Sequence, residues 1–269
     1  MPSPSPRLTA AVCATLAALL STLVVAGWDP LLSFDAHVAS ELHRTALAEP
    51  GWTRFNRVLT DWVWDPWTMR ALLAVVFLWL LLRGAARPAL WVAATALVGT
   101  LLQQVLKALL DRDRPRWERP VDSADFAALP SGHAMTAALT CGLLLWLAHL
   151  RAVHRIARLA MLWAGAITVA GVGFTRVYLG VHWPTDVVTG WLLGIAVAAA
   201  AAALWQRRDS PRPRPRERRP EEAGSVARRW RPDETEQPGE RGRSRAIPRV
   251  ARDRHSSGSG HRPPGPEDQ

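Results

Sequence analysis

Residues 184–205 read PTDVVTGWLLGIAVAAAAAALW, and after Asp186 this stretch contains no charged residue. An apolar run of about 17–25 residues is long enough to cross a bilayer as a helix. Five comparable runs precede it, at residues 8–26, 67–82, 88–110, 133–150 and 156–174. The run 67–82 is short, and it spans only if residues 64–69 are partly embedded. The sequence therefore predicts an all-α protein, a bundle of six transmembrane helices.

The composition changes abruptly at Gln206. From there to Gln269 the chain is rich in Arg, Pro, Gly, Ser and Glu, and its 17 Arg against 11 acidic residues give +6 of the total charge of +10. Such a segment has too little apolar surface to fold. We therefore expect a membrane domain over residues 1–205 and a disordered, basic tail over residues 206–269. Its charges are mixed and no aromatic pattern accompanies them, so we expect no nucleic-acid partner.

The short loops predict the orientation of the bundle. Two short loops carry arginines and no acid, at Arg83 and Arg87 and at Arg151, Arg155 and Arg158, and Arg207 and Arg208 follow the sixth run at the same end of the predicted spans. Positively charged loops stay in the cytoplasm, so this end and the tail are predicted to be cytoplasmic. Residues 28–66, 111–132 and 175–183 are then extracytoplasmic. The first of these segments is expected to contain a short interfacial helix.

The first run has an alternative interpretation as a signal peptide cleaved near residue 26. Its single charge, Arg7, and its length favour a retained span instead. Cys13 and Cys141 both lie within apolar runs, so neither a disulfide nor a metal site is expected from them.

Two sets of polar residues at the predicted outer end are suited to binding an anion. Lys107 and Arg114 are close to two helical turns apart and are predicted to share one helix face, with Pro115 ending the helix. Ser131 is a good N-cap for the fourth run, and Gly132 allows the backbone to approach a ligand closely. The free N–H groups of that helix end favour an anion. A plain helix start does not explain why His133 follows directly.

The third set contains Arg176, His182 and Asp186. His182 and Asp186 are four residues apart around Pro184, which suits a first helical turn. Asp186 is therefore expected to accept one imidazole N–H and to leave the other nitrogen free as a nucleophile or base. Together the three sets supply what phosphoryl transfer needs without a metal: cations for the oxygens, a nucleophile and a proton donor. No metal and no cofactor are expected.

The three motifs read KALLDRDRP at 107–115, PSGH at 130–133 and TRVYLGVHWPTD at 175–186. In order and spacing they resemble the type 2 phosphatidic acid phosphatase superfamily, which also includes soluble vanadate haloperoxidases. The resemblance covers about residues 60–205, and only Thr175 departs from it, where the family has Ser. It implies the six-helix fold of the membrane branch of that superfamily.

The resemblance also implies a role for each residue of the motifs. His182 would attack phosphorus and form a phosphohistidine, and Asp186 would orient it. His133 would protonate the leaving oxygen and later activate water. The phosphoryl oxygens would be held by Lys107, Arg114, Ser131, Gly132 and Arg176.

A lipid phosphate or diphosphate in the membrane is the substrate that this combination predicts. Undecaprenyl diphosphate suits a site on the extracytoplasmic face of a cell membrane, and phosphatidic acid and phosphatidylglycerol phosphate remain alternatives. A non-catalytic lipid carrier on the same fold is a further alternative, and a soluble haloperoxidase is disfavoured by the spans. The head group, the chain preference and the oligomeric state stay open, and Gly190 and Gly194 alone do not indicate a dimer.

Overall fold

The computed structural model describes residues 5–209, so the predicted tail from residue 210 onward lies outside the described residues. The described part is helical and contains no strand. Six helical runs are long and apolar enough to cross a membrane. The predicted all-α, six-span bundle is therefore confirmed for the part of the chain that the structure describes.

The spanning helices match the predicted runs closely. They are α1 (Pro6–Val25), α4 (Pro66–Leu82), α5 (Ala86–Leu110), α6 (Gly132–Leu150), α7 (Arg155–Tyr178) and α8 (Pro184–Asp209). Helix α8 continues through four residues that the sequence had assigned to the tail. Arg207 and Arg208 lie in its last turn, where positive charge interacts favourably with the helix dipole.

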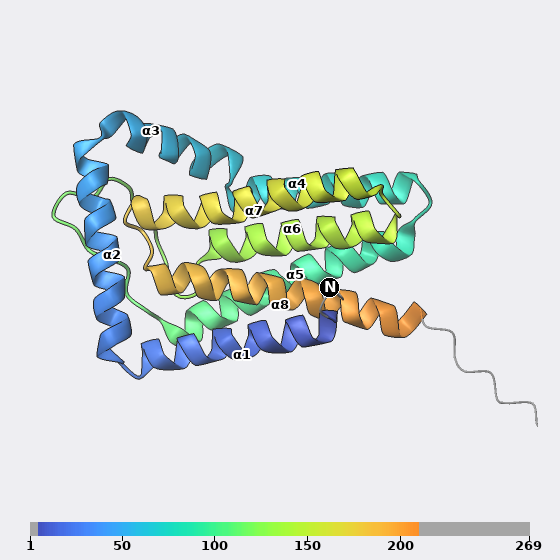
Figure 1. Ribbon diagram of the computed structural model, residues 1–269, viewed down its shortest axis with the longest axis horizontal. Helices are drawn as coiled ribbons and strands as arrows, with labels where there is room; N and C mark the ends of the chain where they lie inside the picture. Colours follow the sequence, from blue (N-terminus) through green and yellow to red (C-terminus); the bar gives the residue numbers. More distant parts are fainter. Residues whose placement is uncertain (1–4, 210–269) are drawn as a thin grey trace, which may run out of the picture. The chain divides into compact units, whose positions relative to one another are not determined.

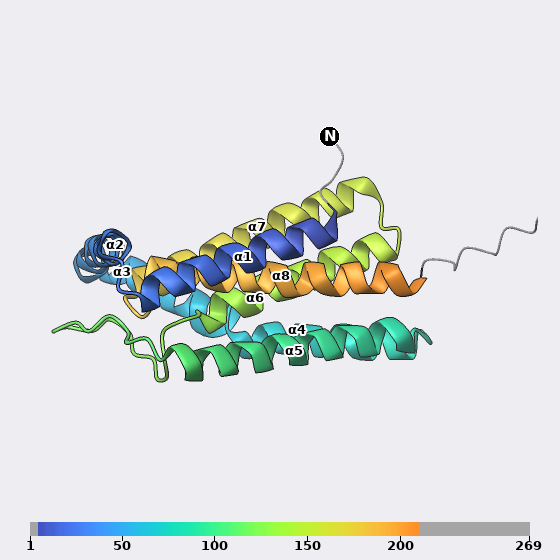
Figure 2. The same cartoon turned by 90° about the horizontal axis from the view of Figure 1, so that it is seen from below.

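The segment before α4 is more helical than predicted. In place of one short interfacial helix it forms α2 (Asp29–Ala48), α3 (Pro50–Val58) and a π-helical turn, Leu59–Val63. In Figure 1, α2 lies across the ends of the bundle helices, and Figure 2 shows it nearly end-on at the same end. This end also holds the loop 111–131, so α2 and the loop together cover one end of the bundle.

The helix starts follow local rules. At α1 the Ser5 hydroxyl accepts a hydrogen bond from the Leu8 N–H at 3.3 Å. At α4 the Asp65 carboxylate accepts one from the Trp67 N–H at 2.6 Å, and Pro66 occupies the first turn. Both ends use a short polar side chain to satisfy a free N–H group.

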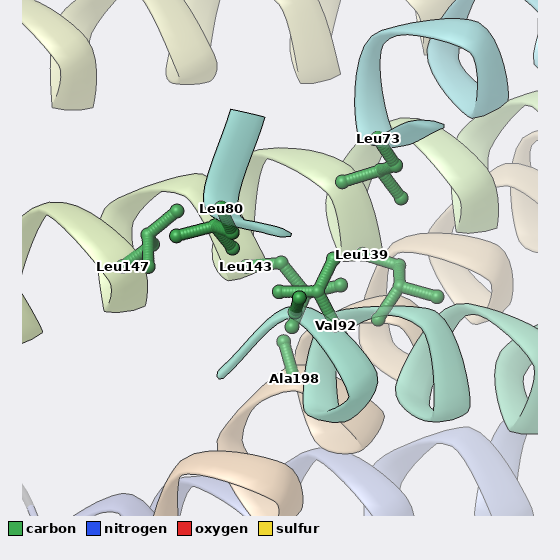
Figure 3. Packing of buried hydrophobic residues seen from close by; sticks show 8 residues of the cluster. Leu73, Leu80, Val92, Leu139, Leu143, Leu147 and Ala198 are labelled. Carbon is green, nitrogen blue, oxygen red and sulfur yellow. The ribbon is translucent and has the colours of Figure 1, made fainter. Parts of the chain in front are cut away.

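A compact apolar core joins four of the helices at the end away from α2. Leu80 of α4, Val92 of α5 and Leu143 of α6 are almost fully buried there, and Ala198 of α8 packs against the same cluster (Figure 3). Elsewhere α6 and α8 approach backbone to backbone. A Cβ atom on Gly194 would lie 2.5 Å from the Met135 carbonyl oxygen, so no larger residue fits without a shift.

Large apolar side chains cover much of the outer surface of the bundle. Leu82, Trp67, Trp163 and Ile156 are among the most exposed. On a water-soluble protein so extensive an apolar surface would be a liability, whereas lipid solvates it well. The exposed face is thus the one expected to contact the bilayer.

Several of the tryptophan and arginine pairs lie at the end of the bundle remote from α2. The guanidinium groups of Arg83 and Arg151 lie over Trp79 at 5.6 and 5.3 Å from the ring centroid. Arg208 lies over Trp91 at 4.9 Å in the same way. Such cation–π pairs suit an interface between lipid and water.

Candidate active site

A cavity of about 330 Å³ with several charged lining residues lies at the end of the bundle that α2 covers, among α4 to α7, the loop before α6 and the turn before α8. Six of the eight residues that the sequence selected line it: Lys107, Arg114, Gly132, His133, Arg176 and His182. The other two, Ser131 and Asp186, are fully buried directly behind the lining residues. Positions up to 79 residues apart in the chain, from Lys107 to Asp186, are thus brought to one place, because the ends of α5, α6, α7 and α8 meet there.

His182 lies in the short turn between α7 and α8, and its ring is almost fully buried. Its Nδ1 atom is 3.4 Å from Asp186 Oδ2. Its Nε2 atom is 3.2 Å from Nη1 of Arg114 on the cavity side. The ring is therefore held by a carboxylate at one nitrogen, while the other nitrogen meets a cationic donor.

The protonation state of His182 follows from this environment. Burial, together with the nearby charges of Arg114, Arg176 and Lys107, holds the pKa of the imidazole well below its usual range. The ring is consequently neutral at physiological pH. With Nδ1 protonated toward Asp186, the lone pair of Nε2 accepts a hydrogen bond from Arg114, whose side chain also lines the cavity.

Lys107 and Arg114 do not share a helix, contrary to the prediction from their spacing. Helix α5 ends at Leu110 because Asp111 adopts a left-handed conformation, with φ 33° and ψ 45°. Arg114 therefore belongs to the loop, where it donates to the carbonyl oxygens of Phe126 and Val181 at 2.8 and 2.6 Å. The two cations still converge, since both donate to the Ala127 carbonyl.

Arg176 is buried in the last turn of α7. Its Nη1 atom donates to the Thr60 hydroxyl at 3.3 Å and lies 3.7 Å from a carboxylate oxygen of Asp122. Its Nε atom is buried and has no hydrogen-bond partner among the described residues. A buried donor without a partner is costly, and a bound oxyanion in the cavity would satisfy it.

The start of α6 also leaves polar groups for an anion. Ser131 is the N-cap residue by backbone geometry, but its hydroxyl makes none of the expected capping bonds. Within the described chain this hydroxyl is buried without a partner. A Cβ atom at Gly132 would lie 2.7 Å from Nε2 of Gln103, the end of a flexible side chain that would have to move aside.

The structure reveals a buried ion-pair network that sequence reasoning missed. Arg112 donates from Nη1 to Asp186 Oδ1 at 2.6 Å and from Nη2 to Asp35 Oδ2 at 2.8 Å. Asp35, on α2, also accepts from the Thr185 N–H at 3.0 Å. Arg112 thus links the partner of His182 to the helix that covers the bundle end. Its place two residues before Arg114 was the only available signal in the sequence.

Among residues 5–209, no three His, Cys, Asp or Glu side chains come together in a way that could hold a metal ion.

Comparison with known proteins finds a family whose sequence pattern covers the three motifs that meet at this cavity. The sequence pattern of the PAP2 superfamily matches residues 88–210, which contain all three motifs. Phosphatidylglycerophosphatase B of Bacillus subtilis (strain 168) is 39% identical over 97 residues, or 35% of this chain and 47% of that protein. Undecaprenyl-diphosphatase of Sulfolobus acidocaldarius is 60% identical over 30 residues, 11% of this chain and 15% of that protein. The matched stretches thus span at most about half of these relatives.

The fold is shared with a solved structure. A transmembrane PAP2-type phosphatidylglycerolphosphate phosphatase from Bacillus subtilis superimposes with a TM-score of 0.66 at 21% identity, covering 76% of this chain and 99% of that one. At this identity the likeness concerns the fold, which is a transmembrane one. The PAP2 superfamily pattern thus matches residues 88–210 with all three motifs, and the six apolar helices together with the shared transmembrane fold make the chain a multi-pass membrane protein.

Proposed function

We propose that this protein is a lipid phosphate phosphatase that works through a phosphohistidine on His182. The observation that carries the proposal is the position of His182 between Asp186 and the cavity, with Nδ1 3.4 Å from the carboxylate and Nε2 3.2 Å from Arg114. In a neutral ring oriented in this way the Nε2 lone pair accepts from Arg114, and it becomes free to attack phosphorus when that guanidinium turns to a phosphate oxygen.

In the first half of the reaction, Nε2 of His182 forms a bond to phosphorus, and the bond from phosphorus to the oxygen on the lipid side breaks. The leaving oxygen takes a proton from His133, which lines the same cavity at the start of α6. Asp186 stabilises the positive charge that develops on the His182 ring. The products are the phosphoenzyme and the lipid alcohol or, for a diphosphate, the lipid monophosphate.

In the second half, His133 accepts a proton from water, and the hydroxide attacks the phosphohistidine. The bond from phosphorus to nitrogen then breaks, and inorganic phosphate leaves. His182 returns to its neutral state with its nitrogen lone pair restored.

Lys107, Arg114 and Arg176 supply the charge that stabilises the transferring phosphoryl group. Three cations around one cavity, together with the Ser131 hydroxyl and the Gly132 N–H at a helix start, can neutralise the oxygens of a terminal phosphate. A magnesium ion performs this task in many other phosphoryl-transfer sites. We therefore propose that turnover is independent of divalent metal.

The position of the cavity supports a lipid substrate on the extracytoplasmic side. The cavity lies at the bundle end that holds α2, opposite the end with Arg83, Arg151 and Arg208. If the arginine-rich end is cytoplasmic, the reacting phosphorus lies at the outer surface of the membrane. Undecaprenyl diphosphate and phosphatidylglycerol phosphate are the proposed substrates, and the names of the two relatives agree with both.

The test uses the purified full-length protein in detergent with EDTA. It should release phosphate from undecaprenyl diphosphate or phosphatidylglycerol phosphate, with phosphatidic acid measured beside them at equal surface concentration. Vanadate should inhibit, because it can occupy the phosphoryl position and bond to His182. A requirement for added divalent metal would contradict the metal-free mechanism. Inactivity on all three lipids would instead favour the non-catalytic carrier.

A further inference from the structure

We propose that Arg70 forms a second anion subsite in the catalytic cavity, which binds a phosphate located between the scissile phosphate and the lipid tail. This inference rests on the proposed function and narrows its substrate class. It predicts that the preferred lipids carry two phosphates in series, as a lipid diphosphate or a phosphatidylglycerol phosphate does, and that phosphatidic acid is a poorer substrate.

Arg70 is an unusual residue for its location. It is the fifth residue of α4, and the twelve helix residues that follow it, up to Leu82, are all apolar. An ionised side chain inside a transmembrane helix is costly and normally has a partner or a function. None of the motifs includes Arg70, so the mechanism gives it no role.

The contacts of Arg70 leave its hydrogen-bonding capacity unused. The side chain lines the cavity together with Lys107, Arg176 and His182. Its guanidinium lies over the ring of Trp67, 5.1 Å from the centroid. Its Nε atom is buried without any hydrogen-bond partner among residues 5–209. The Trp67 ring holds one face of this guanidinium, and its buried Nε–H has no acceptor among the described residues. An oxyanion bound in the cavity would supply that acceptor.

The depth of Arg70 matches the order of groups in such a lipid. Arg70 is four residues inward from Pro66 at the outer end of α4, which is about 6 Å along the helix axis. The catalytic His182 precedes the first residue of α8 and so lies at the outer end of the bundle. A lipid enters with its tail in the bilayer, and its second phosphate therefore lies deeper than the terminal one. Arg70 is on that deeper side.

The size and charge of the cavity also exceed what a single phosphate needs. Its volume of about 330 Å³ corresponds to roughly eleven waters, at about 30 Å³ each in the liquid. Arg70 adds a fourth cation to Lys107, Arg114 and Arg176, while the acids in the lining are Asp65 and Asp125. The Asp65 carboxylate is engaged in capping α4. The net positive charge of the lining suits an anion with more than one phosphate.

The experiment compares substrates that carry a second phosphate with matched substrates that lack it, and the members of the glycerolipid pair differ by a whole glycerol phosphate unit. The first pair is farnesyl diphosphate and farnesyl monophosphate, and the second is phosphatidylglycerol phosphate and phosphatidic acid with the same acyl chains. Both pairs are assayed with the full-length protein and with Arg70→Gln and Arg70→Lys. We expect Arg70→Gln to lower kcat/KM about 10- to 100-fold for the two-phosphate member, as the loss of a hydrogen bond to a charged group predicts. The one-phosphate member should change little, and Arg70→Lys should retain part of the preference.

The two pairs also distinguish the two possible sources of the second phosphate. A loss confined to the farnesyl pair assigns the subsite to a diphosphate, and a loss confined to the glycerolipid pair assigns it to a phosphodiester. Either result supports the subsite.

Arg83→Gln is the matched control. Arg83 stacks on Trp79 much as Arg70 stacks on Trp67, but it caps the opposite end of α4, outside the cavity. This variant should leave the preference within each pair unchanged.

Inhibition provides a measurement that needs no turnover of the two-phosphate lipids. With phosphatidic acid as substrate, the inhibition constant of the wild type should be lower for inorganic pyrophosphate than for inorganic phosphate. Arg70→Lys should reduce the difference between these two inhibition constants. Equal losses on both members of each pair, or no loss on either, would overturn the subsite while leaving the proposed function intact. A wild type that hydrolyses none of the four lipids would overturn the proposed function, and the subsite with it.

Discussion

His182 has different chemistry at its two ring nitrogens. Asp186 Oδ2 also accepts the Trp183 N–H at 2.9 Å, so the carboxylate that faces Nδ1 is fixed in position by the backbone next to it. Arg114 is fixed in turn by carbonyl oxygens on both sides of the cavity. The ring is therefore oriented before substrate arrives, and binding need not supply the entropy of ordering it.

The first prediction concerns the two histidines. His182→Ala should abolish phosphate release, because the nucleophile is removed. His133→Ala should lower kcat about 10²- to 10⁴-fold, the usual contribution of a positioned acid or base. With an activated leaving group that needs no proton, the His133 variant should accumulate phosphoenzyme, which acid-labile radiolabel on the protein would reveal. Full activity of His182→Ala on a lipid phosphate would rule out the mechanism.

Between elements, the network of Arg112 connects α2 to the start of α8. Both carboxylates that it pairs, on Asp35 and Asp186, are at most 1% exposed. Breaking a buried pair by removing one partner leaves an uncompensated charge, which is strongly destabilising. Arg112 is thus a positioning residue whose effect on stability must be separated from its effect on catalysis.

A double substitution makes that separation. Arg112→Gln alone should lower both the thermal stability and kcat, the latter about 10- to 100-fold, because Asp186 loses a charged hydrogen bond. Adding Asp35→Asn removes one of the stranded charges and should restore much of the stability, but not kcat. KM should change less than kcat in both variants. If the double variant recovers kcat along with stability, Arg112 has only a structural role.

The close contact between helices α6 and α8 leads to a second prediction about how elements pack. A Cβ atom on Gly190 would lie 2.7 Å from the carbonyl oxygen of Ser131, and one on Gly194 would lie 2.5 Å from that of Met135. The GxxxG spacing is thus used within the chain, to bring the helix that starts after Ser131 against the helix that carries Asp186.

Gly190→Ala should therefore separate two groups of site residues and lower both the melting temperature and kcat. Thermal unfolding in detergent and phosphate release would measure the two effects. Gly51→Ala is the control, since a Cβ atom at Gly51 meets nothing within 4 Å. A Gly190→Ala protein with wild-type stability and turnover would show that the helices can move apart without consequence.

The sequence predicted the features that depend on residues close together in the chain, and it missed contacts between residues far apart in the chain. The pairing of His182 with Asp186 follows from a spacing of four residues at a helix start, and the spans follow from runs of apolar residues. The pairing of Arg112 with Asp35 joins positions 77 apart, and nothing near Asp35 in the sequence marks it as a partner. Likewise, helical spacing predicted that Arg114 and Lys107 lie on one helix. Spacing alone does not reveal that Asp111 adopts a left-handed conformation, which ends α5 before Arg114.

For the whole molecule, we predict that the cavity lies on the extracytoplasmic side of the membrane. Ser123 is exposed in the loop beside the cavity, and Ala152 is exposed at the arginine-rich end. In a background without Cys13 and Cys141, Ser123→Cys should react with a membrane-impermeant thiol reagent on intact cells. Ala152→Cys should react only after the cells are permeabilised. The reverse pattern would place the cavity in the cytoplasm and remove the argument for an outer-leaflet substrate.

Helix α1 packs along α8, so the first and last spans of the described chain are neighbours (Figure 2). Ala17 and Val24 of α1 are buried in the assembled bundle. During synthesis α1 leaves the ribosome first, and the helix that it must contact leaves last. The nascent chain therefore holds α1 in the bilayer without that neighbour until α8 has been inserted. His182 and Asp186 are delivered together with that last helix, so the cavity side chains Lys107, Arg114 and Arg176 are synthesised before the histidine that they surround.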